Sequence, residues 1–342
     1  MKFVNNINYY INNNLGVVTM VLFTPKSKNN EKKVVESTSE LNNKNILEII
    51  SNDSDWKARL FVVEKTHDES ILSIIAKGDN DRDVRIAAVK KLTDKSVLKD
   101  IAKSDSDWKV RLDAVKKIND KKILVDIAEN NSDWKVRRAA VKKINDEEIL
   151  VDIAKNNTDS KVQCVAVKKI RDENTLINIA KNHHDIDVRM VATGKLNDAD
   201  VLEYIAKNDS DPGVRLVAID GITDEDVLTT IAKNDDDWKV RLSLVEYLTD
   251  DDVLADIAKS DSDSYIRVSV IDKIIDDDVL AYIARNDHDW VVRFAAVEKL
   301  TDENILVDIA ENDSDHKVRL AASERIADED IINNIVNKDK TK

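Results

Sequence analysis

The chain has 342 residues, more than one hydrophobic core usually organises, so we expect either several domains or a repeat array. Charged residues make up 35% of it, while glycine (5) and proline (2) are scarce, a composition that favours helices over sheets. The formal net charge of −14 argues against a general binder of nucleic acid or anionic membranes, because both attract basic proteins.

The N-terminal part differs from the rest. Residues 1–31 are predicted to be a disordered or leader segment, because the apolar run 15–23 is too short to cross a bilayer and lacks a signal-peptide cleavage pattern. We hypothesise that Met20 is the true start, which peptides from 1–19 in the natively expressed protein would contradict. Residues 32–52 resemble a degenerate N-terminal capping repeat, with an apolar helical face.

Residues 53–338 form a repeat array with a period of 26 residues, followed by a tail at 339–342. An aspartate recurs eleven times at this interval, and an arginine stands four residues after it in every repeat except that of Gln163. A second aspartate row follows thirteen residues behind the first. Such regularity predicts a stack of equivalent structural units. Representative members of the first aspartate row and the arginine row are Asp55, Arg59, Asp81, Arg85, Asp107, Arg111, Asp133, Arg137, Asp237, Arg241, Asp289 and Arg293.

Each repeat is predicted to form two short helices, each capped by one of the aspartates. In one repeat Asp107 caps a helix over 108–118, and Asp120 caps the second. A capping carboxylate accepts hydrogen bonds from free backbone N–H groups and stabilises a helix by about 1 kcal/mol. A single pair cannot bury its apolar stripes, but stacked pairs can, so the predicted fold is an all-α solenoid of about eleven two-helix repeats. The loop sequences rich in aspartate, such as NDSD and SDSD, are explained by helix capping.

The pattern Asp-x-x-Val-Arg, followed at helical spacing by Ala-Val or Ala-Ala, resembles HEAT repeats, in particular the short HEAT-like repeats of the phycobilisome-lyase type. The resemblance extends over nearly all of 32–338, and the repeat length is also similar to that of the leucine-rich-repeat variant. It implies that the aspartate and arginine rows form a ladder between neighbouring units. These residues are then structural rather than catalytic.

Five tryptophans stand immediately after the first cap of their repeats. They could form an aromatic ladder that stacks bases or anchors a partner. They could instead cover the seam between repeats, an interpretation favoured by Ser160 and Pro212 at equivalent positions. The tryptophans are Trp56, Trp108, Trp134, Trp238 and Trp290.

The exposed positions that vary between repeats define two candidate surfaces. On the first helices a basic stripe runs through repeats two to five and turns acidic in the C-terminal half. On the second helices an acidic face suits a basic protein segment. The basic stripe consists of Lys90, Lys91, Lys116, Lys117, Lys142, Lys143, Lys168 and Lys169. The acidic face consists of Asp100, Asp126, Asp152, Glu203, Asp256 and Asp308.

Catalytic and cofactor motifs are not found in the sequence, so we expect no enzyme activity, no cofactor and no metal site. The five histidines share no repeat position, and only His183 and His184 are adjacent. Cys164, the one cysteine, excludes an intramolecular disulfide and a thiolate-only metal cluster, and it fits a reducing, cytoplasmic compartment. No phosphate-binding glycine loop or nucleophile–base arrangement occurs.

The sequence is compatible with three functions. The net charge favours a non-catalytic scaffold or adaptor that binds a protein, which the acidic face predicts to be basic. The second is a nucleic-acid-associated protein that uses the basic stripe. The third, an accessory subunit related to bilin-lyase-type proteins, follows from the resemblance alone. The partner, the oligomeric state and the face that binds do not follow from these patterns.

Overall fold

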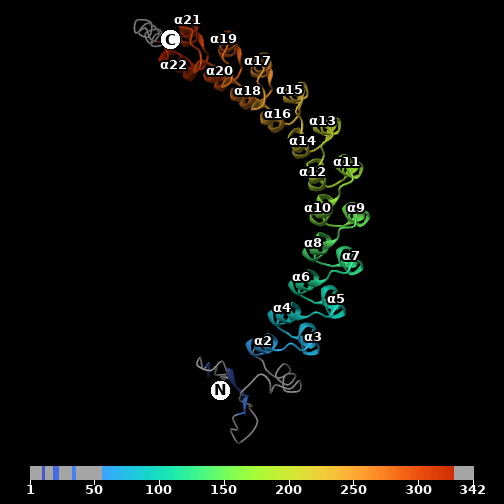
Figure 1. Ribbon diagram of the computed structural model, residues 1–342. Helices are drawn as coiled ribbons and strands as arrows, with labels where there is room; N and C mark the ends of the chain where they lie inside the picture. Colours follow the sequence, from blue (N-terminus) through green and yellow to red (C-terminus); the bar gives the residue numbers. More distant parts are fainter. Residues whose placement is uncertain (1–9, 12–17, 23–32, 36–55, 327–342) are drawn as a thin grey trace. The chain divides into compact units, whose positions relative to one another are not determined.

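The chain is almost entirely helical over the residues that the structure describes. In this described part, twenty-one helices, α2 to α22, follow three short strands. Figure 1 shows helices of two alternating rows, one row of even-numbered and one of odd-numbered labels, in each of two compact units. This confirms the predicted all-α solenoid of two-helix repeats. The computed structural model describes residues 10–11, 18–22, 33–35 and 56–326, and its units are 1–170 and 171–342.

The three strands form an antiparallel sheet in the order β1-β2-β3, with Met20 paired to Val35. Neither the predicted leader, 1–31, nor the predicted capping repeat, 32–52, was expected to contain strands. Most of both ranges lies outside the described residues, as do Asp55 and the tail. The strands are β1 (Tyr10–Ile11), β2 (Val18–Leu22) and β3 (Lys33–Val35).

The even-numbered helices are the first helices of the repeats and the odd-numbered ones are the second helices. In the first unit the first helices are α2 (Trp56–Lys65), α4 (Arg82–Lys91), α6 (Trp108–Lys117), α8 (Trp134–Lys143) and α10 (Ser160–Lys169). Its second helices are α3 (Glu69–Gly78), α5 (Lys95–Ser104), α7 (Lys121–Asn130) and α9 (Glu147–Asn156). In the second unit the first helices are α12 (Ile186–Thr193), α14 (Pro212–Ile219), α16 (Trp238–Val245), α18 (Ser264–Ile271), α20 (Trp290–Val297) and α22 (His316–Glu324). Its second helices are α11 (Glu173–Asn182), α13 (Ala199–Asn208), α15 (Glu225–Asn234), α17 (Asp251–Ser260), α19 (Asp277–Asn286) and α21 (Glu303–Asn312).

An aspartate caps the N-terminus of every helix from α3 to α22, as the two aspartate rows predicted. At α5 the Oδ1 atom of Asp94 accepts hydrogen bonds from the backbone N–H groups of Ser96 and Val97, at 2.8 and 3.0 Å. These bonds satisfy donors that the helix itself leaves without partners. The caps therefore set where each short helix begins.

The helices pack in a register that the repeat pattern does not show. Each second helix packs most extensively against the first helix of the next repeat, as α5 does against α6. Buried Ile101 and Ala102 of α5 and buried Val110 and Ala114 of α6 belong to this core. The small alanines allow the helix axes to approach closely. The compact pair is therefore α5–α6 and not the two helices of one sequence repeat. Neighbouring first helices also pack together, whereas neighbouring second helices contact each other much less.

Candidate binding surfaces

The arginine that recurs in the repeats is buried in nine of them, and in most of these it links two successive loops. Arg85 in α4 donates from Nε and Nη2 to the two carboxylate oxygens of Asp105, at 2.9 and 3.0 Å, in the loop after α5. Its Nη1 donates to the backbone oxygen of Asp79 at 2.9 Å, in the loop before α4. The hydrogen bond to Asp105 raises the pKa of Arg85, against the opposing effect of burial. The same fork joins Arg59–Asp79, Arg189–Asp209, Arg215–Asp235, Arg241–Asp261, Arg267–Asp287 and Arg293–Asp313.

The carboxylate of this ladder differs from the one that the resemblance implied. The capping aspartates, such as Asp107, bind the starts of the helices, and the arginine pairs with the aspartate two residues earlier. Asp105 also accepts a hydrogen bond from the backbone N–H of Asp107 at 2.8 Å, so one carboxylate holds both the loop and the arginine. Helix capping alone therefore does not explain the loop aspartates. Their recurrence every 26 residues, two positions before the first cap, was the signal for this pairing.

The ladder loses charge in the later part of the first unit. Asn131 replaces the loop aspartate, and Arg111 donates to its Oδ1 over a longer distance of 3.3 Å. Gln163 replaces the arginine in α10, is 2% exposed, and its Nε2 atom has no hydrogen-bond partner within the described part of the chain. A neutral amide cannot form the forked ion pair that a guanidinium forms. The arginine ladder is thus weaker in these repeats than in α4 or α18.

Four of the eight lysines of the candidate basic stripe cap the C-terminus of the preceding first helix. Lys143 donates from Nζ to the backbone oxygens of Val115 and Lys116, at 3.3 and 2.7 Å, at the C-terminus of α6. Burial lowers the pKa of Lys143, and likewise that of Lys169. A cation at this position satisfies terminal carbonyls and suits the negative end of the helix. Equivalent bonds to the preceding first helix are made by Lys91, Lys117, Lys169, Lys273 and Lys299.

The other half of the basic stripe is exposed. It consists of Lys90, Lys116, Lys142 and Lys168. Lys116 pairs with Asp113 on its own helix, with Nζ and Oδ1 2.5 Å apart. The stripe therefore presents one lysine per repeat to a ligand instead of the two that the sequence predicted.

The acidic face of the second helices is crossed by ion pairs between neighbouring repeats. Lys77 of α3 pairs with Asp100 of α5 at 2.9 Å, and Lys233 of α15 pairs with Asp256 of α17 at 2.8 Å. The hydrogen bond from Lys233 lowers the pKa of Asp256. Lys103 with Asp126 and Arg285 with Asp308 form the equivalent pairs, and Asp152 accepts from Asn156.

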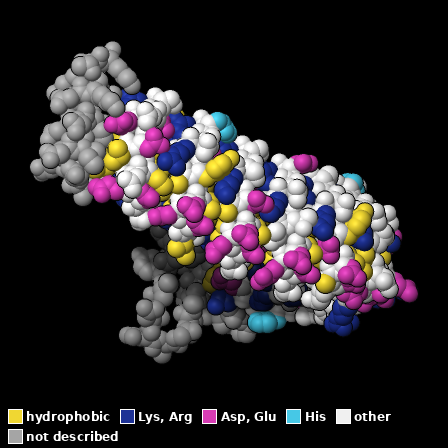
Figure 2. Space-filling view, turned by 90° about the horizontal axis from the view of Figure 1, so that it is seen from above, with side chains coloured by type: hydrophobic (Ala, Val, Ile, Leu, Met, Phe, Trp, Pro, Cys, Tyr) yellow, Lys and Arg dark blue, Asp and Glu magenta, His cyan; other side chains and the backbone are white. Residues whose placement is uncertain are grey.

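Glu203 does not belong to the same row as the other acidic residues. It lies one position out of register and pairs with Lys207 on its own helix, at 2.6 Å. The position equivalent to Asp100 is occupied by Tyr204, whose ring centroid lies 4.1 Å from the Nζ atom of Lys181. Cationic and apolar side chains therefore interrupt this face, and Figure 2 shows the two charge signs and apolar side chains interspersed on the face in view.

Three of the five tryptophans lie under a lysine of the following repeat, whereas the equivalent positions after Trp56 and Trp238 hold Asp83 and Tyr265. The Nζ atom of Lys135 is 4.0 Å from the ring centroid of Trp108, and that of Lys161 is 4.7 Å from Trp134. Trp290 holds the same relation to Lys317, at 4.3 Å. Since a cation over the ring face is favourable and occupies the surface that a base would stack on, these contacts favour the covering role at the seam between repeats.

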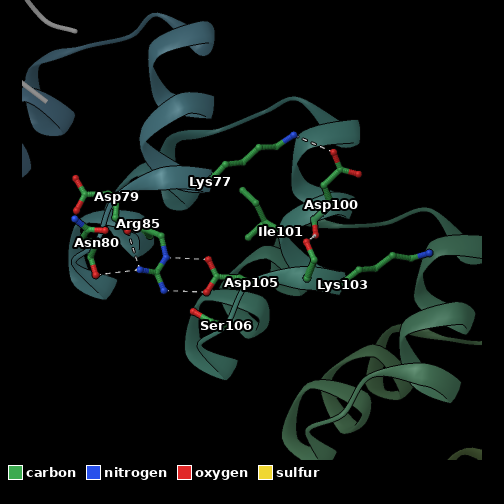
Figure 3. Close-up of a pocket in the computed structure, with 10 residues that line it drawn as sticks. Lys77, Asp79, Asn80, Arg85, Asp100, Ile101, Lys103, Asp105 and Ser106 are labelled. Carbon is green, nitrogen blue, oxygen red and sulfur yellow. Dashed lines mark hydrogen bonds and ion pairs between the residues drawn. The ribbon is translucent and has the colours of Figure 1, made fainter. Parts of the chain in front are cut away.

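A polar pocket of about 730 Å³ lies at the loops around α3, α4 and α5. Figure 3 shows the fork of Arg85 on Asp105 within it, and Lys77 pointing toward Asp100. Lys103, which also lines it, pairs with Asp126 outside it. The charged side chains of the pocket are thus paired with one another or with neighbours, and they serve the ladders between repeats.

Exposed large apolar side chains are concentrated in the second unit. Within the described residues the first unit has two of them, Trp56 and Ile74. The second unit has nine, and they lie on helices and loops of both rows. Contiguous exposed apolar surface commonly marks an interaction site. These residues are Ile186, Tyr204, Trp238, Tyr247, Tyr265, Ile275, Tyr282, Val291 and Leu320.

Comparison of the sequence with protein-family models gives no match, and comparison with curated proteins gives none either. In the described part of the chain no helix is long and apolar enough to span a membrane. The same residues contain no group of three or more His, Cys, Asp or Glu side chains placed to hold a metal ion. The chain is a helical repeat protein on the evidence of its period and its paired helices.

Proposed function

We propose that this chain is a non-catalytic, HEAT-like scaffold or adaptor that binds a partner protein through its exposed helix faces in the cytoplasm. The observation that carries the proposal is that recurring and variable residues of a repeat have different roles. Recurring residues are used internally, as helix caps, as the arginine ladder or in the core. Most residues that vary between repeats are exposed, and in the second unit they include nine large apolar side chains. Repeat proteins present binding surfaces at such variable positions.

The acidic face remains available to a basic partner. An exposed ion pair such as Lys233–Asp256 contributes about 0–1 kcal/mol, since solvent screens it. A lysine or arginine of a partner can therefore replace the internal lysine at little cost. Binding of this kind would be sensitive to salt.

The nucleic-acid alternative is less well supported. A phosphate backbone requires a continuous row of accessible cations, and the stripe offers one exposed lysine per repeat. The net charge of −14 opposes binding further. No structural observation favours the accessory subunit of a lyase.

Affinity capture from native lysate, with and without nuclease, tests the proposal. Each eluate is analysed by mass spectrometry and for bound nucleic acid. We expect protein partners that survive nuclease and that are retained by a variant with Lys90, Lys116, Lys142 and Lys168 changed to glutamate. Recovery of nucleic acid, with protein partners lost after nuclease and lost in the lysine variant, would overturn it.

A further inference from the structure

Four exposed apolar residues of the second unit lie on consecutive first helices, each among the first five residues of its helix. Trp238 of α16, Tyr265 of α18, Val291 of α20 and Leu320 of α22 are 41%, 62%, 40% and 56% exposed. We call them the apolar strip. The helices that carry them pack in sequence, α16 on α18, α18 on α20 and α20 on α22. The rings of Trp238 and Tyr265 meet edge to face with centroids 6.3 Å apart, so the strip is continuous at this point.

The fold does not need these side chains to be apolar. The positions equivalent to Tyr265 and Val291 hold Lys109, Lys135 and Lys161 in the first unit, and these repeats fold in the same way. A lysine there covers the tryptophan of the preceding repeat, as Lys135 covers Trp108. At Tyr265 and Val291 the strip therefore leaves apolar area in solvent where other repeats carry a lysine, including Lys239 on α16 and Lys317 on α22 at the two ends of the strip. Large aromatic side chains in such positions are typical of the centres of protein interfaces.

The strip lies near the N-terminal ends of these first helices, and carboxylates border it at their C-terminal ends. Glu246, Asp272 and Glu298 are exposed and follow α16, α18 and α20 directly. Asp272 lies seven residues after Tyr265, which is two helical turns on the same face and about 10 Å away. In the first unit these positions hold Glu64 followed by Lys90, Lys116, Lys142 and Lys168, so a continuous row of negative charge at this border belongs to the second unit.

We propose that the apolar strip and its acidic border dock a basic amphipathic segment of a partner protein, with apolar side chains on the strip and Lys or Arg toward the carboxylates. This inference deepens the proposed function and rests on it. The apolar contact supplies affinity, and the border sets orientation and selects against acidic segments. The strip is a different face from the acidic face of the second helices, which carries Tyr204 and Tyr282.

A displayed library of random peptides, selected against the full chain, tests this assignment without knowledge of the partner. We expect enriched peptides that combine aromatic or aliphatic residues with lysine or arginine. Their affinity should fall about tenfold or more for Tyr265→Ser/Val291→Ser, which removes contacts on the apolar strip, and for Asp272→Lys/Glu298→Lys, which reverses the charge of its border. Tyr282→Ser is the matched control, since it removes another exposed tyrosine, 53% against 62% for Tyr265, from the second-helix row, and it should leave the affinity unchanged.

Three results would overturn the assignment. Enriched peptides that bind the Tyr265→Ser/Val291→Ser variant as well as the original chain would place the site elsewhere. Self-association of the chain that this variant abolishes, measured by light scattering, would identify a second copy as the occupant. Failure to enrich any peptide would also overturn it, and the lysate capture would then decide the proposed function separately. Circular dichroism of each variant establishes that it is folded.

Discussion

Two ion pairs of the same residue types in the second unit should contribute very differently to stability. Arg267 of α18 is 2% exposed and donates to both carboxylate oxygens of Asp287, at 2.7 and 2.8 Å. Arg285 of α19 pairs with Asp308 at 3.1 Å, with side chains that are 44% and 47% exposed. The variants Arg267→Ala and Arg285→Ala thus remove the same side chain from a buried and from a solvated pair.

The expected loss of stability depends on whether a variant leaves the remaining carboxylate buried or in solvent. Removing one partner of a buried pair costs about 3–5 kcal/mol, because the other charge loses its compensation. Asp287 keeps one donor, the backbone N–H of Asp289 at 2.8 Å. We therefore expect the lower end, about 3 kcal/mol, for Arg267→Ala. An exposed pair contributes about 0–1 kcal/mol, so Arg285→Ala should cost less than about 1 kcal/mol.

Native-state hydrogen exchange is the appropriate assay, because a repeat array can open locally and a single global unfolding energy is then poorly defined. The free energy of opening is measured at the backbone amides of α18 and α19. The double variant Arg267→Ala/Asp287→Asn should recover part of the loss, since it leaves no buried charge unpaired. The reasoning is refuted if Arg267→Ala lowers the opening energy no more than Arg285→Ala does.

Three further predictions concern helix ends, glycines and acid. Lys143→Ala should destabilise the chain to urea by about 0.5–1.5 kcal/mol through lost hydrogen bonds, and equal effects of the control Lys142→Ala would contradict the capping role. Gly194→Ala should raise the melting temperature, since the added Cβ would meet its neighbours at 3.5 Å, an ordinary contact distance. Gly221→Ala should not raise it, because its Cβ would lie 2.7 Å from buried Leu202. A higher melting temperature for Gly221→Ala than for Gly194→Ala would contradict this prediction. Five aspartates have lowered pKa values in the folded chain and bind protons less readily there than when unfolded, so their contribution is present above about pH 3.9 and is lost as the pH falls below it. Urea titrations between pH 3 and 6 should show this loss, and stability that is flat or rising toward pH 3 would contradict it. These aspartates are Asp126, Asp146, Asp172, Asp256 and Asp289.

The candidate surfaces were only partly predictable from the sequence. The exposed positions could be recognised because side-chain direction follows the helical period. Whether these positions are available to a partner could not be recognised from the sequence. Lys90 and Lys91 are neighbours with the same charge, and only Lys91 reaches back to the carbonyls of the preceding first helix. The side chain of a lysine is long enough either to extend into solvent or to reach the carbonyls of a neighbouring helix. The distance to that helix decides between the two roles.

The sequence by itself determined the period, the all-helical repeat and the start of each helix, because these depend on residues within one or two turns of one another. Aspartate caps and apolar stripes are local features of this kind. Only the tertiary structure decided that α5 packs with α6 and that Arg85 pairs with Asp105 instead of a capping aspartate. Both depend on how separate helices lie in space, and a strict repeat allows more than one such arrangement, because every unit offers the same residues at each step.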